Sequence, residues 1–383
     1  MKNCVKYSKL KEVCLDFIVP QRDKPKSFDG TIPWCRIEDI EGKYLNGSKS
    51  NQNVSKELAD SMNMHICPQG TVICACSASI GNQAITTIDC YTNQTFIGVV
   101  VNPTLLFNEY LYYFFSFQKE NLQKMGRGAT IKYISRDKFE NLIIPVPPVA
   151  EQERIVAELD LLSGIIEKKK EQLKAYDQLA QSIFYTMFGD PITNEKGWDI
   201  KKLGDIGKII TGNTPSTRDE RNYDSDDVCF FKPSDIAKDG ISLLGESEFH
   251  VSSFAYNNSR KLPKGSVLVT CIGIVGKVGI LEIDAMCNQQ INAIIPNEDV
   301  TSVYVAYSVL SERKIIESIA HAPVVPIINK GEFSQLCIPL PPLHLQEEFA
   351  EKVEAIERQK ALVQQSIEET QTMFDYTMDK YFG

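Results

Sequence analysis

An internal repeat constrains this chain more than any other feature of its sequence. Pro145-Val-Pro-Pro148 recurs 194 residues later as Pro339-Leu-Pro-Pro342, and each copy is followed closely by Gln-Glu. The same offset joins Phe188-Gly189 to Phe382-Gly383, and further upstream the offset drifts to 195 and 196. Because self-similarity at a fixed spacing marks a repeated structural unit, the sequence predicts one module used twice over nearly all 383 residues.

Each module has a mixed first part and a helical second part. Short β-branched runs punctuated by Gly, Pro and Asn fill the first part, with one helical stretch near Glu109 to Lys124 in the first copy. In the second part, apolar residues step by four and three along the chain, a pattern typical of a coiled-coil seam. The predicted helix-pair seam consists of Ile155, Leu159, Leu162, Ile166, Leu173, Ile183, Phe349, Val353, Ile356, Val363, Ile367 and Phe374.

The pattern predicts a mixed α+β fold, with two pseudo-symmetric α/β domains separated by a pair of long antiparallel coiled-coil helices. The predicted bounds are 1–148 for the first domain, 149–189 for the central helix, 190–342 for the second domain and 343–383 for the C-terminal helix. A generic bundle whose seam is only core is the alternative for the heptads alone. A duplicated unit of one domain and one long helix most simply gives a molecule with two domains, in which the helices set the spacing between the domains.

Charge and composition limit the possible functions. The formal net charge is −9, of which the helical segments 151–190 and 343–383 carry −3 and −5. Residues 1–150 carry +3 and residues 191–342 carry −4, so neither predicted domain has the charge to hold nucleic acid by electrostatics alone. No apolar run reaches the ~18 residues of a membrane helix, and the charged N-terminus lacks the apolar core of a signal peptide. The 11 cysteines, an odd number, favour a reducing compartment, and we predict a cytoplasmic protein.

Motifs for chemistry are scarce. The four histidines lack metal-ligand spacing, and Cys67, Cys74 and Cys76 lack the second pair or histidine that a metal site requires. Gly273, Gly276 and Gly279 fit neither a phosphate loop nor a dinucleotide fingerprint, and tight turns between strands explain them better. Nucleophile-elbow, zinc-protease and adenine-methylase motifs are also missing from the sequence. We therefore predict no catalytic residues, no metal site and no cofactor bound by this chain.

Several ordered stretches resemble the specificity subunit of type I restriction–modification systems. Thr211-Gly-Asn-Thr-Pro-Ser216 and Phe230-Phe-Lys-Pro-Ser-Asp-Ile236 resemble the opening of a target-recognition domain of that family. Ile32-Pro-Trp-Cys-Arg-Ile-Glu-Asp-Ile40 resembles the matching segment of the first domain, although Val19-Pro-Gln-Arg22 stands there in place of Gly-x-Thr-Pro-Ser. Gly126-Arg-Gly-Ala-Thr-Ile-Lys-Tyr-Ile134 resembles the junction with the helix, and the second copy departs from it. Each motif is weak, but their order matches over essentially the whole chain.

The resemblance implies a non-catalytic subunit that reads a split double-stranded DNA target, one half-site for each recognition domain, with the helix pair setting the gap. It implies two adenine-N6 methyltransferase subunits as partners, which would carry the S-adenosylmethionine. Motor-nuclease subunits that use ATP and Mg would be further partners for cleavage. Partner subunits could then neutralise much of the phosphate charge that this acidic chain cannot.

Candidate DNA-binding residues lie in loops with basic or hydroxyl side chains. Arginine suits guanine and phosphate, and most such contacts position a protein on the backbone rather than read bases. Asn93-Gln94 and Asn288-Gln289 recur in both copies, which favours a structural role over reading different bases. The candidates are Arg22, Lys24, Lys26, Arg127, Thr130, Lys132, Thr214, Ser216, Arg218, Arg221, Lys277 and Lys330.

Two other functions are compatible with parts of the pattern. A coiled-coil scaffold without a DNA role would explain the heptads, and it predicts no DNA affinity even with partners present. A self-sufficient restriction–methylation enzyme is nearly excluded by the missing methylase and nuclease motifs. An N6-adenine methyltransferase encoded beside this gene would favour the specificity subunit.

Overall fold

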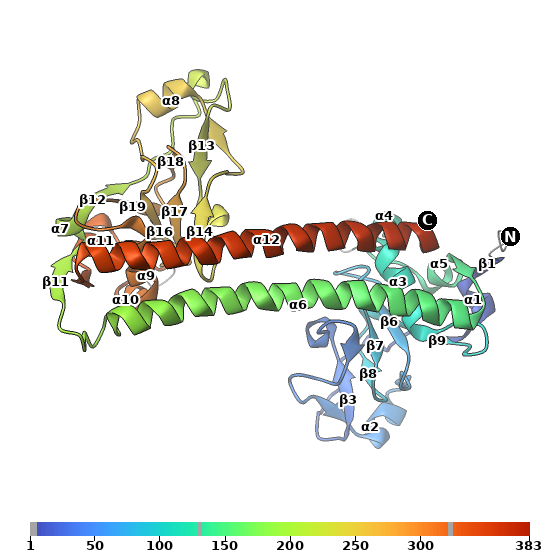
Figure 1. Cartoon of the computed structure of the whole chain (residues 1–383). Coiled ribbons are helices and arrows are strands. Elements are labelled where there is room, and N and C mark those ends of the chain that lie inside the picture. The colour runs from blue at the N-terminus through green and yellow to red at the C-terminus, as the bar shows by residue number, and fades with distance from the viewer. Residues whose placement is uncertain (1–5, 129–131, 321–324) are drawn as a thin grey trace. The chain divides into compact units, whose positions relative to one another are not determined.

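The computed structural model describes residues 6–128, 132–320 and 325–383, coloured along the chain in Figure 1. The chain divides into two compact units, and each long helix contributes to both. Unit 1 is residues 1–168 with 366–383, and unit 2 is residues 169–365. The predicted α+β class with two long helices is confirmed, whereas the predicted domain bounds remain a prediction. None of the helices in the described part of the chain is both long and apolar enough to span a membrane.

Unit 1 contains three sheets, and its buried apolar residues form separate clusters. Its five-stranded sheet has the order β2-β9-β6-β7-β4, in which only the β4–β7 pair is parallel. A three-stranded sheet has the order β5-β3-β8, and β1 pairs with β10. The strands are β1 (Lys6–Lys9), β2 (Cys14–Ile18), β3 (Ile32–Cys35), β4 (Tyr44–Leu45), β5 (Asn53–Val54), β6 (Val72–Ala75), β7 (Gln83–Thr86), β8 (Tyr91–Thr92), β9 (Phe96–Val101) and β10 (Ile143–Val146).

Unit 2 repeats this topology strand for strand. Its sheets have the orders β12-β19-β16-β17-β14, β15-β13-β18 and β11-β20, and again the pair between the last two strands of the large sheet is parallel. The repeat in the sequence is therefore a repeat of the fold. The strands are β11 (Asp199–Lys202), β12 (Gly207–Thr211), β13 (Val228–Phe231), β14 (Ile241–Leu244), β15 (His250–Val251), β16 (Val267–Thr270), β17 (Val278–Leu281), β18 (Met286–Cys287), β19 (Ile291–Pro296) and β20 (Cys337–Leu340).

The helices also recur in pairs, except η2, which has no counterpart among the described residues of unit 1. The helical stretch expected near Glu109 to Lys124 is two helices, α3 and α4, which meet at Gln118 (φ −79°, ψ 1°). In unit 1 the helices are α1 (Leu10–Val13), η1 (Ile37–Asp39), α2 (Lys56–Ser61), α3 (Asn108–Phe117), α4 (Lys119–Met125) and α5 (Arg136–Glu140). In unit 2 they are α7 (Leu203–Ile206), η2 (Glu220–Asn222), η3 (Pro233–Asp235), α8 (Ser253–Asn257), α9 (Ser302–Ser311), α10 (Arg313–Ile319) and α11 (Lys330–Ser334). The long helices are α6 (Val149–Phe188) and α12 (Leu343–Phe382).

A buried glutamine fixes the start of each long helix to its own unit. Gln152 accepts a hydrogen bond from the Phe107 backbone N–H (2.8 Å) and donates to the carbonyl oxygens of Leu105 (2.9 Å) and Pro147 (2.8 Å). Gln346 likewise accepts from the Thr301 N–H (3.0 Å) and donates to the Pro341 carbonyl (2.8 Å). Both side chains are fully buried, so the repeated Gln-Glu motif has a structural explanation.

In both units, α6 and α12 contribute to the core. In unit 2, Phe184 and Phe188 of α6 pack against Phe349 of α12, while Asp177 contacts Lys360, so the paired segments run antiparallel. Phe184 and Phe188 are more buried than the seam residue Ile183 because they also face α9. Among the predicted seam residues, Leu173, Ile183, Val363 and Phe374 are half-buried, and Ile155, Leu159, Leu162, Ile166, Phe349, Val353, Ile356 and Ile367 are buried.

Candidate nucleic-acid interface

In unit 1, two loops meet beside the large sheet. The backbones of Arg127 and Tyr133 exchange hydrogen bonds of 3.1 and 2.9 Å, and Tyr133 also bridges to Ser77 after β6. Burial raises the pKa of the Tyr133 hydroxyl, and the nearby positive charge of Arg22 opposes this rise. Arg22, Arg127 and Lys132 are exposed, so the structure brings three predicted residues to this surface. The predicted Thr130 lies outside the described residues.

A cavity of about 620 Å³ opens beside the paired residues Arg127 and Tyr133. Lys132, next to Tyr133, and Lys119 from the start of α4 both line it. The remaining lining residues are Ala78, Ser79, Ile80, Asn82 and Gln123. Two ammonium groups among amide and hydroxyl side chains form a surface suited to phosphate oxygens and base edges. Sequence reasoning missed Lys119 because a lysine inside a helical pattern gives no signal of its own.

Unit 2 forms the equivalent loops, and its bridge between Ile272 and Ile327 corresponds to the bridge between Ser77 and Tyr133 in unit 1. The Gly273 N–H donates to the Pro326 carbonyl (3.0 Å), and the Ile328 N–H donates to the Cys271 carbonyl (3.0 Å). Gly273 and Gly276 have φ of 80° and 77° in the turn between β16 and β17, which confirms that these two glycines are turn residues. The prediction was wrong for Gly279, which lies within β17 and pairs with Ser242 and Leu268. The side chains differ from those of unit 1, since Ile274 is 58% exposed at this edge.

The Thr211–Tyr223 loop of unit 2 carries four predicted residues, and several of their polar groups have partners within the unit. The Thr214 hydroxyl donates to Gln289 Oε1 (2.7 Å), and Ser216 Oγ accepts from the Arg218 N–H (3.3 Å). Arg221 forms an ion pair with Asp219 (2.8 Å) and lies 4.4 Å from the centre of the Phe254 ring. All four side chains are exposed. Of the two arginines, Arg221 has its charge paired with Asp219, so Arg218 is the stronger candidate for a contact with phosphate.

The remaining candidates differ in how far they reach solvent. The Lys277 ammonium donates to the Pro233 carbonyl, and burial together with Arg313 lowers the Lys277 pKa. Lys330 is exposed at the first residue of α11. In the loop before β3, Lys24 and Lys26 are exposed, and the Lys24 ammonium lies 5.5 Å from the Phe28 ring centre.

The recurring asparagines hold turns. Asn93 Oδ1 accepts from the Thr95 N–H (3.3 Å) between β8 and β9, and Asn288 Oδ1 accepts from the Gln290 N–H (3.0 Å) between β18 and β19. This agrees with the structural role that their recurrence indicates.

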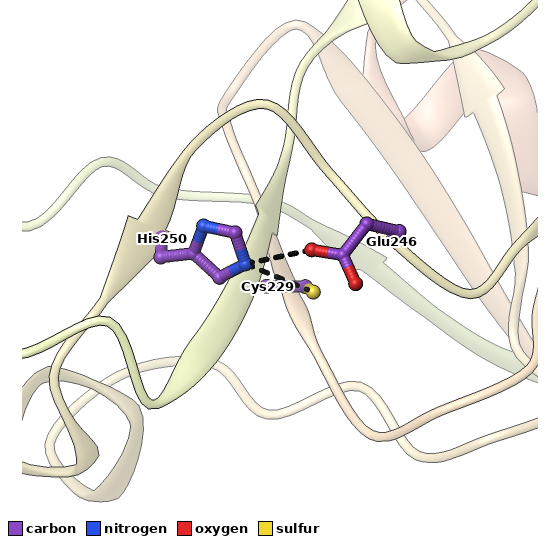
Figure 2. A group of neighbouring side chains, drawn as sticks. All are labelled: Cys229, Glu246 and His250. Carbon is purple, nitrogen blue, oxygen red and sulfur yellow. Dashed lines mark hydrogen bonds and ion pairs between the residues drawn. The ribbon is translucent and has the colours of Figure 1, made fainter.

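One group of side chains with metal-ligand chemistry lies in unit 2. His250 Nε2 is 3.1 Å from Glu246 Oε1 and 3.6 Å from Cys229 Sγ (Figure 2). The three ligand atoms lie within 4.8 Å of one another. The cysteines considered from the sequence, Cys67, Cys74 and Cys76, are instead fully buried, Cys74 within β6 and Cys76 directly after it, and burial raises the pKa of the Cys76 thiol to about 12.

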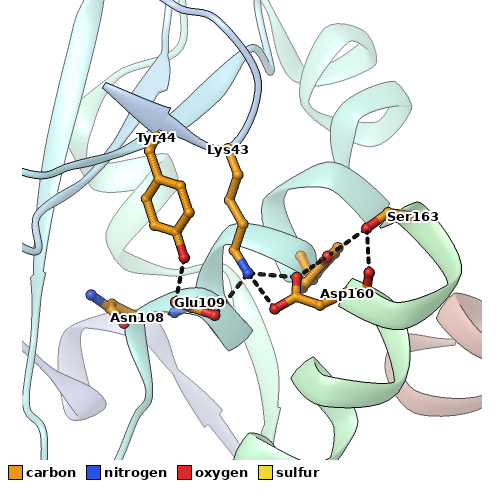
Figure 3. Close-up of polar contacts among 7 residues, drawn as sticks. Lys43, Tyr44, Asn108, Glu109, Asp160 and Ser163 are labelled. Carbon is orange, nitrogen blue, oxygen red and sulfur yellow. Dashed lines mark hydrogen bonds and ion pairs between the residues drawn. The ribbon is translucent and has the colours of Figure 1, made fainter. Parts of the chain in front are cut away.

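An ion network joins the loops of unit 1 to α6. The Lys43 ammonium lies 2.7 Å from Glu109 Oε2 on α3 and 2.6 Å from Asp160 Oδ1 on α6 (Figure 3). The Tyr44 hydroxyl donates to Glu109 Oε1 (2.7 Å), and the Tyr113 hydroxyl donates to Asp160 Oδ1 (2.5 Å). Burial and the hydrogen bond to Asp160 raise the Tyr113 pKa. The network fixes the α3 and α6 segments of unit 1 to one another.

Comparisons with known proteins agree with this architecture. A family model described as "Type I restriction modification DNA specificity domain" matches residues 4–175 and 195–371. The MjaIX specificity subunit of a type I restriction enzyme from Methanocaldococcus jannaschii is 29% identical over 208 residues. That alignment covers 50% of this chain and 48% of the relative, so the chain spans about half the length of this curated relative.

Solved structures support the fold. The S subunit of a type I restriction–modification system from M. genitalium has a TM-score of 0.57 and 14% identity, over 100% of this chain and 98% of that one. A chain from a structure of type I restriction–modification complex assembly has a TM-score of 0.58 and 20% identity, over 98% and 97%. With two copies of the family domain over most of its length, the chain belongs to the type I restriction modification DNA specificity family.

Proposed function

We propose that this chain is a non-catalytic DNA-recognition subunit that reads a bipartite target, one half-site with each unit. The observation that carries the proposal is the pair of equivalent loop surfaces, which share a backbone and differ in side chains. At matching positions unit 1 has the exposed Lys119 and Lys132, and unit 2 has Arg313, whose guanidinium pairs with Glu317, and Pro326. A duplicated frame with unlike surfaces is suited to two unlike half-sites. Family membership does not favour the alternative of a scaffold without a DNA role.

The proposal extends to partners that supply chemistry and charge. With a net charge of −9, the chain alone is poorly equipped to neutralise DNA phosphates. Adenine-N6 methyltransferase subunits would bring the S-adenosylmethionine site and positive surface, and motor-nuclease subunits would bring ATP- and Mg-dependent cleavage. The sequence-based hypothesis that helix length sets the gap between half-sites belongs to this proposal. Removing one heptad from each helix should change the gap and leave the half-sites readable.

The test is reconstitution with an adenine methyltransferase encoded beside the gene. The chain should co-purify with it, and methyl transfer to genomic DNA should require both proteins and occur at one split motif. The methyltransferase alone is the control and should transfer little. Failure to co-purify, or equal methylation with and without the chain, would contradict the proposal.

A further inference from the structure

The second recognition unit holds a cluster that DNA recognition does not explain. Cys229 and His250 stand directly opposite each other on the antiparallel strands β13 and β15. Glu246 approaches the same point from the loop that leads into β15, as Figure 2 shows. Within residues 6–128, 132–320 and 325–383 it is the one group of three Cys, His or carboxylate side chains whose ligand atoms converge this closely.

We propose that Cys229, Glu246 and His250 form a zinc site. The observed spacing of the ligand atoms carries the proposal. Tetrahedral zinc with Zn–N near 2.0, Zn–O near 2.1 and Zn–S near 2.3 Å places N and S about 3.5 Å apart and N and O about 3.4 Å apart. Here His250 Nε2 lies 3.6 Å from Cys229 Sγ and 3.1 Å from Glu246 Oε1. The two separations that involve His250 therefore lie within a few tenths of an ångström of these values, and the sulfur and carboxylate oxygen lie within 4.8 Å of one another.

The donor set selects the kind of metal. A thiolate, an imidazole nitrogen and a carboxylate oxygen suit zinc or cobalt, whereas magnesium and calcium prefer oxygen ligands alone. Cys229 is buried while the Glu246 side chain is 81% exposed, so the site opens to solvent on the glutamate side. Three protein ligands leave a fourth position for water. On binding, the Cys229 thiol loses its proton to solvent, and sulfur, nitrogen and oxygen each donate an electron pair to the metal.

Unit 1 provides a natural comparison. By strand register, Pro33 and Asn53 occupy the places of Cys229 and His250, and proline has no side-chain ligand. The site therefore belongs to unit 2 only. The metal would join β13 to the Glu246 loop and stiffen the small β15-β13-β18 sheet, which has two-residue outer strands.

The test uses the full-length chain, treated with chelator and titrated with Co²⁺ alone. One equivalent should give a sulfur-to-cobalt charge-transfer band in the near ultraviolet together with the visible bands of tetrahedral cobalt. Zn²⁺ should displace the cobalt and abolish both. Cys229→Ser should remove the charge-transfer band, and Glu246→Gln, at an exposed position, should keep that band and weaken binding about tenfold or more.

The controls separate this site from other thiols and from misfolding. Cys337→Ser removes an exposed cysteine elsewhere and should leave the titration unchanged. Circular dichroism shows whether each variant is folded, and Glu246→Gln tests the site even where Cys229→Ser misfolds. A chain that binds no cobalt, or a band that depends on Cys337 and not on Cys229, would overturn the proposal. DNA-dependent methylation is not part of this test, so its result is independent of the proposed function.

Discussion

The two units have the same backbone plan and different chemistry at equivalent positions. Their large sheets have the same strand order, and their helix starts are fixed by equivalent glutamines. In their candidate interface loops, the hydrogen bond from the Ile134 N–H to the Cys76 carbonyl recurs from the Ile328 N–H to the Cys271 carbonyl. At the candidate interface, unit 1 has Ser79, Asn82, Lys119, Gln123 and Lys132, where unit 2 has Ile274, Lys277, Arg313, Glu317 and Pro326. The comparison shows that the two units share backbone contacts that hold the loops in place. They differ in the loop side chains that a ligand would contact.

The largest expected effect is a difference in unfolding free energy between substitutions in the cores of the two units. Phe184 of unit 2 is 1% exposed and packs against Tyr304, Tyr307 and Phe349, whereas unit 1 has Met378 at the equivalent position. Phe184→Ala should cost about 3–5 kcal/mol of unfolding free energy, and Met378→Ala a smaller amount near 2 kcal/mol. Hydrogen exchange during denaturant titration would localise each loss to its own unit. Equal losses of unfolding free energy from the two substitutions, or a loss of protection in both units from one substitution, would contradict the prediction that the two cores differ.

The second difference is electrostatic and depends on pH. Burial raises the pKa of Glu312 to about 7, and unit 1 has Gln118 at the equivalent position. Since the folded chain holds this proton more tightly than the unfolded chain, stability should fall as pH rises from about 4.5 to 7 and then stay level. Glu312→Gln should remove this slope and stabilise the chain at pH 8 by at most about 3 kcal/mol. Denaturation midpoints of both forms across pH 4–8 test this, and parallel curves would refute it.

The glutamine contacts test what the units share. Gln152→Ala and Gln346→Ala should each cost about 1–3 kcal/mol, because each leaves a buried backbone N–H without its acceptor. The exposed Gln178→Ala serves as the control and should change stability by less than about 0.5 kcal/mol. Unfolding free energies measure all three. A marked difference between the two buried positions would mean that the helix starts are not held equivalently.

The smallest expected effect concerns one turn. Ala78 has φ of 56° where unit 2 has Gly273 at 80°. A Cβ at Gly273 would meet nothing within 4 Å, so Gly273→Ala tests backbone strain alone and should cost about 1–2 kcal/mol. Ala78→Gly should stabilise unit 1 by about 0.5–1 kcal/mol, since relief of strain exceeds the added chain entropy. Thermal unfolding would detect either change, and effects of the opposite sign would show that the turns differ.

Much of the fold could be predicted because its signals are periodic. The offset of 194 to 196 residues revealed the duplication, and the heptads revealed α6 and α12. The helix ends were harder, because Phe184 and Phe188 face α9 as well as α12, and a heptad pattern describes only one neighbour. The break between α3 and α4 at Gln118 was also missed, since no Gly or Pro marks it.

The interface was less accessible to sequence reasoning because it depends on contacts between distant loops. In the sequence, a basic residue in a loop looks the same whether its side chain is exposed, like that of Arg218, or bonded to a carbonyl, like that of Lys277. Lys119 joins Lys132 at one cavity only through the fold. The Cys229–His250 pair depends on strand register, which no spacing in the sequence encodes.

The most direct test of the central claim is a base-resolution map of N6-methyladenine in cells that carry this gene, lack it, or carry it with one unit altered. The unit 1 variant is Lys119→Ala with Lys132→Ala, and the unit 2 variant is Ile274→Ser. The account predicts one split motif that disappears without the gene, with each variant changing the preference for a different half of it. A map that does not depend on the gene, or variants that weaken both halves alike, would contradict the claim that each unit reads its own half-site.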